Sequence, residues 1–293
     1  ERAVYRKPYA EMQEGAKRVT PTDDQKRAVE SIFATDKTVS LLFGVTGSGK
    51  TEVYMEAIER TLAEGKKAIM LVPEISLTPQ TLRNFRARFG EKVALMHSGL
   101  GVGERYDEWK RALTGEADIV IGARSAVFAP LDNVGLIVLD EEHDGSYVSE
   151  SNPRYDTAEV AEFRVRQTGG KLVLGSATPS IDSFEAAQEG RYNLIVMDRR
   201  ISGRGMPPIE IVDMSKELLA GNADIFSRRL MQEMDGALTR GEQVMLFLNR
   251  RGHSSFAMCR NCGYVPKCEN CDVALSYHSV EKALVCHYCG ARY

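Results

Sequence analysis

Eight consecutive residues, Gly44 to Thr51, have the composition of a phosphate-binding loop. They read Gly-Val-Thr-Gly-Ser-Gly-Lys-Thr, in which glycines let backbone N–H groups wrap phosphate oxygens and the lysine reaches the outer phosphates. The apolar run Val39 to Phe43 precedes the loop and a helical pattern follows it, so a helix N-terminus would add its dipole to the anion site. We therefore predict a nucleotide and magnesium site made by Gly44, Gly47, Ser48, Gly49, Lys50 and Thr51.

A second group of residues suited to phosphate chemistry is Asp140-Glu141-Glu142-His143, which directly follows the apolar run Leu136 to Leu139. Hydrolysis of ATP needs one carboxylate to hold the magnesium shell and another to orient and deprotonate the attacking water. We predict that Asp140 and Glu141 fill these roles and act with Lys50 as the catalytic residues. A solvated acidic loop is the alternative interpretation, and the presence of a phosphate loop disfavours it.

Gln25 lies in the segment Thr20 to Lys26, which has the acidic residues typical of the first turn of a helix. A glutamine amide can both donate to and accept from an adenine edge, so we predict that Gln25 contributes to the ATP site. An isolated glutamine in another context would be a surface residue.

All six cysteines fall between positions 259 and 289, in three pairs with the spacing Cys-x2-Cys. Such a pair can place two thiolates on one zinc ion, which takes four ligands at ~2.3 Å. In a cytosolic chain this spacing favours metal over disulfides. Six ligands cannot fill two four-cysteine sites; the predicted ligands are Cys259, Cys262, Cys268, Cys271, Cys286 and Cys289.

These motifs need a scaffold that brings the ends of several strands together. Short apolar runs alternate with longer segments of helical period, which predicts an α/β fold with a parallel sheet whose ligands bind beyond the carboxyl ends of the strands. An irregular stretch at 202–222 predicts a boundary before a second lobe. We predict strands at 39–43, 68–72, 93–96, 119–121, 136–139, 172–174 and 243–248, and helices at 52–62, 79–89, 104–113, 157–166 and 228–238.

Composition limits the classes of protein to consider. The 293 residues are 43% hydrophobic and 27% charged, as in ordinary globular proteins. The net charge is −3, so any contact with nucleic acid has to be local. The sequence contains neither a signal peptide nor an apolar run of the ~18 residues that a membrane span needs, so we expect a cytoplasmic protein with no membrane partner. Because the chain starts at Glu1 without methionine and ends four residues after a cysteine pair, we also expect a piece of a longer protein.

The motifs together resemble those of superfamily 2 helicases. Gln25, the phosphate loop, the Asp140 to His143 segment and then Gly175-Ser176-Ala177-Thr178 occur in the order of that family. The segments at 71–78, 97–100, 122–130 and 248–252, with the cysteine pairs, are similar to the bacterial replication-restart helicases of the primosomal protein N′ family. The resemblance covers the chain from residue 20 to its end.

This resemblance implies a domain organisation. Residues 20–200 would form a RecA-like P-loop NTPase lobe, after a linker at 1–19 from an N-terminal DNA-binding region. Residues 201–258 would form the connector and the start of a second RecA-like lobe, which carries a small, incomplete zinc-binding insertion at 259–293.

The same resemblance implies an ATP-dependent DNA helicase that unwinds 3′ to 5′ at stalled or repaired forks, restarts replication and assembles the primosome. Its partners would be forked and single-stranded DNA, single-stranded DNA-binding protein and other primosome proteins, and it would be a monomer associated with the nucleoid. The isolated piece would bind ATP and hydrolyse it weakly, because the family's second lobe completes the ATP site.

The resemblance also assigns Zn²⁺ ligands. Cys268, Cys271, Cys286 and Cys289 would form one complete site, whereas Cys259 and Cys262 would share a second site with cysteines beyond Tyr293. His278 and His287 are alternative ligands, although a surface role is more common for histidine.

Contact with DNA is predicted from three places in the sequence. Arg124 and Ser125 follow a predicted strand and could bind phosphates, and the resemblance assigns coupling between ATP and DNA to Ser176 and Thr178. Tyr147 and Tyr155 lie in the polar loop after the carboxylates, where aromatic rings could stack on bases for ~1–3 kcal/mol each. Packing of these tyrosines in the core is an equally compatible interpretation.

Two other functions fit part of the sequence. Another superfamily 2 motor, such as an RNA helicase or a restriction translocase, would share Lys50, Asp140 and Glu141, but the cysteine pairs and the 122–130 segment speak against it. A zinc-dependent binding module could instead use nucleotide as a structural ligand, and loss of hydrolysis in a Glu141→Gln variant would separate this from an enzyme.

Overall fold

The computed structural model describes residues 20–74, 78–203, 205, 207–247, 259, 262, 264–278 and 282–293. The chain divides into two compact units, Glu1–Gly205 and Met206–Tyr293, which are described separately. The predicted linker at 1–19 and the 248–252 segment lie outside the described residues.

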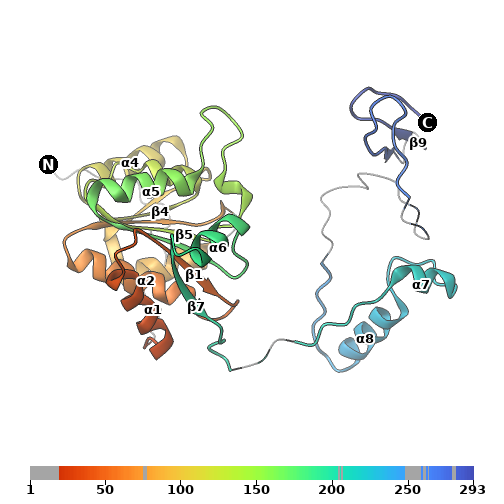
Figure 1. The fold of residues 1–293 in the computed structure, drawn as a ribbon, viewed down its shortest axis with the longest axis horizontal. Coiled ribbons are helices and arrows are strands. Elements are labelled where there is room, and N and C mark those ends of the chain that lie inside the picture. Colours follow the sequence, from red (N-terminus) through yellow and green to blue (C-terminus); the bar gives the residue numbers. More distant parts are fainter. Residues whose placement is uncertain are drawn as a thin grey trace. The chain divides into compact units, whose positions relative to one another are not determined.

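The first unit is built on a parallel sheet of seven strands (Figure 1), in the order β3-β4-β2-β5-β6-β1-β7. Every strand runs in the same direction as its neighbours, which confirms the predicted α/β fold. The strands are β1 (Val39–Gly44), β2 (Lys67–Leu71), β3 (Val93–Met96), β4 (Ile119–Gly122), β5 (Val134–Asp140), β6 (Lys171–Ser176) and β7 (Asn193–Met197).

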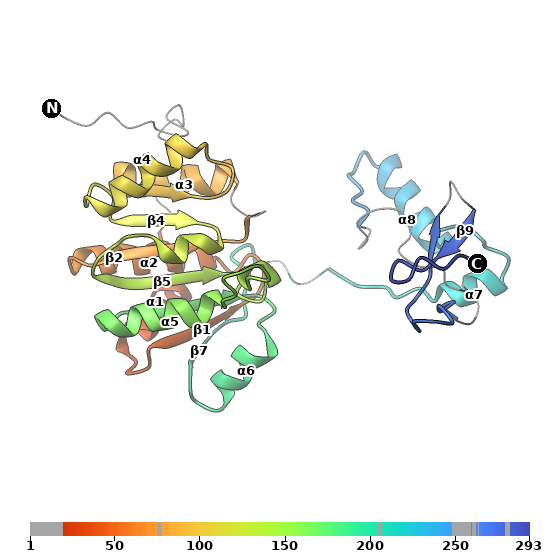
Figure 2. The ribbon, with the colours of Figure 1, turned by 90° about the horizontal axis from the view of Figure 1, so that it is seen from above.

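Helices cover both faces of this sheet (Figures 1 and 2) and enclose two apolar cores. One core contains side chains of α1, α2 and α3, and the other contains side chains of α4, α5 and α6. Short 3-10 turns lie at Gly90–Lys92, Arg124–Phe128 and Gly145–Tyr147. The helices are α1 (Asp23–Ala34), α2 (Lys50–Ala63), α3 (Pro79–Phe89), α4 (Val102–Leu113), α5 (Thr157–Thr168) and α6 (Ile181–Gln188).

The strands follow the apolar runs because parallel strands between two helical layers are buried on both faces. In β5, the six residues from Val134 to Leu139 are all buried. The edge strand β7 was not predicted, because Leu194 and Val196 are exposed and alternate with buried residues instead of forming a continuous buried run. The eight-residue α6 was also not predicted, since it is too short to show a helical period.

The outer edge of β3 is covered by a buried ion pair from α4. Glu108 is 0% exposed, and its carboxylate accepts from Leu95 N at 2.7 Å and from Arg111 Nη1 at 2.8 Å. The same Arg111 nitrogen donates to Val93 O at 3.3 Å. These side chains satisfy edge groups that would otherwise need another strand.

We expect Glu108→Gln to lower the free energy of unfolding by about 3–5 kcal/mol, because it leaves the Arg111 charge buried without a counter-charge. Thermal or urea unfolding of the whole chain measures this. The matched control is Glu189→Gln at the exposed Arg191–Glu189 pair, which should cost about 0–1 kcal/mol. Equal losses in the two variants would contradict the role of the buried pair.

The second unit contains α7 (Met214–Leu219), α8 (Arg228–Thr239), and an antiparallel pair of strands, β8 (Ser276–His278) and β9 (Ala283–Val285). The predicted helix at 228–238 is confirmed. The predicted strand at 243–248 is wrong over 243–247, the part that the structure describes, where no strand forms. An apolar run needs neighbouring strands to become part of a sheet, and the described residues of this unit offer none for a parallel pairing.

Among the helices described in the two units, none has both the length and the apolar composition for crossing a membrane.

Candidate active site and metal centre

The order of the strands brings three predicted motifs to one edge of the sheet. β6 lies between β1 and β5, with Phe43 opposite Ser176 and Asp140 opposite Gly175. The phosphate loop after β1, the Gly175–Thr178 segment after β6 and the acidic segment after β5 therefore follow three adjacent strands. This is the carboxyl edge at which parallel sheets bind ligands.

The phosphate loop has the backbone that its glycines permit. Gly47 and Gly49 have φ angles of 81° and 85°, in the left-handed region that side chains disfavour. Gly49 precedes α2 and provides no side-chain cap. The Glu52 N–H donates to Gly49 O at 3.0 Å, so Lys50 and Thr51 are the residues whose N–H groups could bind an anion at the start of the helix.

Two side chains of the loop also fit a phosphate ligand. Lys50 is buried, and its Nζ donates to Gly44 O at 2.9 Å, a carbonyl bond that a phosphate can replace. The Ser48 hydroxyl is 2% exposed and has no hydrogen-bond partner in the described part of the chain. Thr51 is exposed in the first turn of α2, where its hydroxyl could reach a magnesium ion.

Two other segments hold the loop in place. Gln25 is 1% exposed; its Oε1 caps α1 by accepting from Thr22 N at 2.7 Å, and its Nε2 donates to Gly49 O at 3.2 Å. Each bond uses one of the two donors or lone pairs of the amide, and its contact with adenine stays a prediction. The chain after β7 also crosses the loop, where Ile201 N donates to Gly47 O at 3.0 Å.

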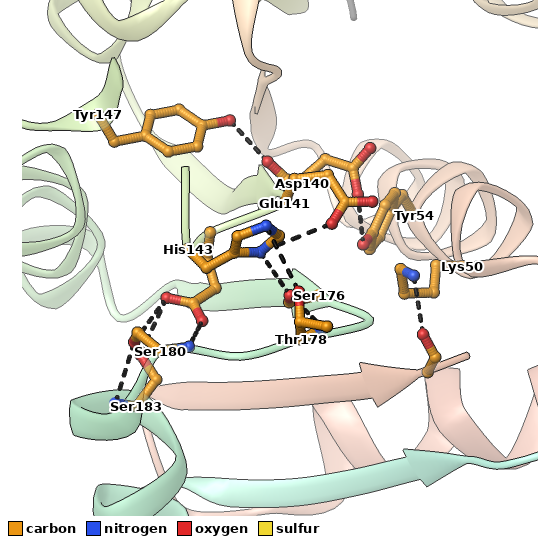
Figure 3. A network of polar contacts seen from close by, with 12 residues as sticks. Lys50, Tyr54, Asp140, Glu141, His143, Tyr147, Ser176, Thr178, Ser180 and Ser183 are labelled. Carbon is orange, nitrogen blue, oxygen red and sulfur yellow. Dashed lines mark hydrogen bonds and ion pairs between the residues drawn. The ribbon is translucent and has the colours of Figure 1, made fainter. Parts of the chain in front are cut away.

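Asp140 ends β5 and is held by two tyrosine hydroxyls (Figure 3). Tyr54 of α2 donates to Asp140 Oδ1 at 2.9 Å, and Tyr147 donates to the main-chain oxygen of Asp140 at 2.8 Å. Burial raises the pKa of Asp140, and the Tyr54 hydrogen bond opposes this rise. The charge of Lys50 in the phosphate loop also lowers the pKa of Asp140, so the carboxylate lies close enough to the loop for a cation to be held between the two.

Glu141 has an unusual backbone conformation for its residue type. Its φ angle is 48°, in the left-handed region, which costs a non-glycine residue about 1–2 kcal/mol. Its side chain is 36% exposed, and Glu141 Oε2 lies 3.7 Å from His143 Nδ1. A partly exposed carboxylate next to a buried one has the arrangement that the predicted general base needs.

His143 connects the acidic segment to the end of β6 (Figure 3). His143 Nδ1 lies 2.7 Å from Ser176 Oγ, and Nε2 lies 3.5 Å from Thr178 Oγ1. Thr178 N in turn donates to Ser176 Oγ at 2.9 Å. A change at Glu141 or His143 therefore reaches Ser176 and Thr178 through direct contacts.

Glu142 makes a separate connection to α6 through Ser180 and Ser183, which are labelled in Figure 3. It accepts from Ser180 N at 2.7 Å, from Ser180 Oγ at 3.1 Å and from Ser183 Oγ at 3.1 Å. A carboxylate at the N-terminus of a helix stabilises its unpaired N–H groups and dipole. Glu142 therefore has a structural role, in contrast to its neighbour Glu141.

A cavity of about 410 Å³ lies beyond the ends of β3 and β4. Arg105 and Arg124 line it, and Arg124 Nη1 donates to Ser146 O at 3.2 Å and to Val148 O at 2.7 Å. Burial lowers the pKa of His97, so its ring is neutral and the arginines supply the positive charge. The other lining residues are Glu74, Met96, Ser98, Ala123, Ser125 and Ser146.

The predicted stacking of Tyr147 on DNA bases is wrong for this structure. Tyr147 is 3% exposed and packs in the core, and Thr157 Oγ1 donates to its carbonyl oxygen at 2.6 Å. Tyr155 is partly exposed; its ring centre lies 5.0 Å from that of Phe128 and 5.7 Å from the Arg124 guanidinium. Its stacking on DNA stays a prediction.

The second unit contains a cluster of four cysteine thiols. The Sγ atoms of Cys268, Cys271, Cys286 and Cys289 all lie within 4.8 Å of one another. Two Sγ atoms bound to one tetrahedral zinc at ~2.3 Å would be ~3.8 Å apart, and those of Cys268 and Cys289 are 3.6 Å apart. The Tyr293 hydroxyl lowers the pKa of the Cys268 thiol to about 6, whereas the neighbouring Cys289 thiol raises the pKa of Cys271, so these thiols titrate as one interacting group.

Each cysteine pair of this cluster is followed by a residue in the left-handed region. These residues are Asp272, with a φ angle of 54°, and Gly290, with 76°. The N–H groups of Asp272 and Gly290 donate to the carbonyl oxygens of Cys268 and Cys286, which closes two similar turns. The grouping that the family resemblance implied for these four cysteines is confirmed.

Cys259 and Cys262 are exposed and do not belong to this cluster. His278 Nε2 and His287 Nε2 lie 3.1 Å apart, and neither histidine belongs to the four-cysteine cluster. A second zinc site that Cys259 and Cys262 would share stays a prediction.

Comparison with known proteins identifies the class. The DEAD/DEAH box helicase family matches residues 22–187, more than half of the chain, and the chain belongs to that family. The PriA DNA helicase Cys-rich region (CRR) domain matches residues 268–292, which include all four clustered cysteines.

Several curated relatives of the chain share one name, that of a replication restart protein. Replication restart protein PriA of Bacillus subtilis is 50% identical over 98% of this chain and 36% of its own length. The protein of the same name from Synechocystis is 49% identical over 85% of this chain and 31% of its own length. A solved structure of RecG bound to a three-way DNA junction covers 70% of this chain and 29% of that chain, at 23% identity and a TM-score of 0.46.

These matches confirm the predicted resemblance to bacterial replication-restart helicases. This chain spans about a third of the length of these two curated relatives.

Proposed function

We propose that this chain is the ATP-binding and zinc-binding part of an ATP-dependent DNA helicase that moves 3′ to 5′. The whole protein would act at stalled or repaired forks to restart replication and assemble the primosome. The observation that carries the proposal is the adjacency of the phosphate loop, the acidic segment and the Ser176–Thr178 segment on three neighbouring strands. The match to the helicase family and the PriA relatives supports the same function.

Each residue would have a distinct task in hydrolysis. Lys50 would exchange its bond to Gly44 O for one to the outer phosphates, where it offsets developing negative charge. Thr51 and Asp140 would hold Mg²⁺, which supplies further charge neutralisation when bound. Glu141 would accept the proton of the attacking water.

Loss of the terminal phosphate would be communicated to DNA through the contacts of His143. Ser176 and Thr178 lie directly against its ring, so a shift of Glu141 and His143 after hydrolysis would move the end of β6. Arg105, Arg124 and Ser125, which line the 410 Å³ cavity, would bind backbone phosphates of the DNA. Such contacts are local and agree with a net charge of −3.

The whole protein would work as a monomer in the bacterial cytoplasm, at the nucleoid, with single-stranded DNA-binding protein and other primosome proteins as partners. The isolated chain would bind ATP and hydrolyse it slowly, because the described part of its second unit contains no parallel sheet that could close over the nucleotide.

The test is the rate of ATP hydrolysis by the full-length protein that carries this chain, with and without forked DNA. We expect forked DNA to increase the rate at least tenfold, and Lys50→Ala to lower it by about 10²–10³-fold. The rate without DNA is the internal control, and forked RNA separates a DNA helicase from an RNA helicase. A rate that DNA leaves unchanged, or that survives Lys50→Ala, would contradict the proposed function.

A further inference from the structure

Tyr54 occupies a position in the site that no sequence motif assigns. It lies one turn after Lys50 on α2 and is 1% exposed. Its hydroxyl donates to Asp140 Oδ1 at 2.9 Å, so one buried side chain joins the helix that follows the phosphate loop to the carboxylate at the end of β5 (Figure 3).

Strand β6, which pairs with β5, leaves room for that hydroxyl. Gly175 lies opposite Asp140 at the end of β6, and a Cβ atom at Gly175 would come within 1.7 Å of the Tyr54 hydroxyl oxygen. No rotation of a small side chain relieves an overlap of this size, because the phenol is itself enclosed. The first residue of the Gly175–Thr178 segment is therefore glycine because the Tyr54 hydroxyl occupies the space that a side chain at this position would fill.

A hydrogen bond from a buried hydroxyl to a carboxylate is stronger than one between neutral groups. Since Tyr54 engages Oδ1, the Asp140 carboxylate cannot rotate freely. Partners that hold a metal-binding carboxylate in this way commonly change metal affinity or activity by 10–100-fold when removed.

We propose that Tyr54 is a positioning residue for the metal of the nucleotide site: its hydroxyl fixes the Asp140 carboxylate so that nucleotide binding is strengthened by Mg²⁺. This inference rests on the proposed ATP site. It goes beyond that site because it assigns a function to a residue outside the phosphate loop and the acidic segment.

Packing alone is the competing explanation, and the chain contains a matched control for it. Tyr147 is also buried, and its hydroxyl donates to the same residue, but to the main-chain oxygen of Asp140 at 2.8 Å. Tyr54→Phe and Tyr147→Phe each delete one buried hydroxyl bonded to Asp140. They differ in whether the carboxylate or the backbone loses its partner.

The experiment measures the affinity of the whole chain for a fluorescent ADP analogue, with excess EDTA and with MgCl₂. The ratio of the two dissociation constants gives the strengthening by metal. We expect Tyr54→Phe to reduce this ratio about tenfold while the affinity in EDTA stays within about twofold. Tyr147→Phe should leave the ratio unchanged, and thermal melting of both variants reports any general loss of stability.

An unchanged ratio in Tyr54→Phe would overturn the inference and assign Tyr54 to packing. Equal losses of the ratio in both variants would also overturn it, since damage to the segment would then explain the effect. Failure of the nucleotide site itself has a different result: the wild-type chain would not bind the analogue, or would bind it equally well after Lys50→Ala.

Discussion

Glu141→Gln should lower ATP hydrolysis by the full-length protein about 10²–10⁴-fold while nucleotide affinity stays within about threefold. The amide has the shape of the carboxylate but cannot accept a proton from water. Glutamine also keeps the side chain at a position whose φ angle is 48°, so the substitution does not relieve the backbone strain as Glu141→Gly would. Steady-state hydrolysis and equilibrium binding of nucleotide measure the two quantities.

The adjacent carboxylate provides the control for this prediction. Glu142→Gln makes the same chemical change one residue further along, where the side chain accepts from Ser180 and Ser183. We expect it to affect stability through the N-terminus of α6 and to leave hydrolysis within about fivefold of wild type. Similar losses of hydrolysis in both variants would contradict the assignment of Glu141 as the base.

A full loss of hydrolysis with retained binding would also exclude the alternative in which nucleotide is only a structural ligand. A structural ligand needs no general base. In that alternative the wild type would not hydrolyse ATP, and the Glu141→Gln protein would be indistinguishable from it in every assay.

The strands and the phosphate loop could be predicted because their signals are local. A strand such as β5 is buried on both faces and must be apolar along its length, and the loop needs glycines at Gly47 and Gly49 for their positive φ angles. Edge strand β7 lacks a continuous buried apolar run. The 243–247 segment has an apolar run, but the described part of its unit contains no strand with which it pairs. A strand depends on its partners, which a single run does not reveal.

The side chains that support the site could not be predicted, because their roles depend on residues distant in sequence. Tyr54 lies 86 positions from Asp140, and Glu142 lies 38 positions from Ser180. Tyr147 could not be placed from the sequence for the same reason. Its position in a polar loop suggests an exposed ring, but the ring is buried by residues distant in sequence. The spacing from Lys50 to Tyr54, one helical turn, is the one local signal that could have indicated Tyr54.

Zinc binding should decide whether the cysteine-rich end of the chain folds at all. Among the described residues, the core there consists of Cys268, Leu275 and Cys286, two of which are predicted metal ligands. A core this small does not stabilise a fold without a metal or cross-links. Zinc binding contributes about 10–16 kcal/mol in isolated zinc-finger peptides, which is enough to fold such a module.

Cys286→Ser should therefore release the zinc and unfold residues of the module while the first unit keeps its nucleotide affinity. Native mass spectrometry measures the zinc content, and proteolysis measures the loss of structure. The control is Cys259→Ser, because Cys259 is exposed and lies outside the four-cysteine cluster. A Cys286→Ser protein that keeps a full equivalent of zinc would contradict the site.

The number of zinc ions in the wild-type chain separates the complete site from the predicted second one. Four thiols within 4.8 Å account for one ion, and the exposed Cys259 and Cys262 supply two ligands toward another. We expect one ion to survive dialysis against a weak chelator, since a tetrahedral zinc with two protein ligands exchanges readily. If the chain retains two ions and Cys259→Ser loses the second, ligands within this chain complete the second site. His278 and His287 would then be the first residues to replace by alanine.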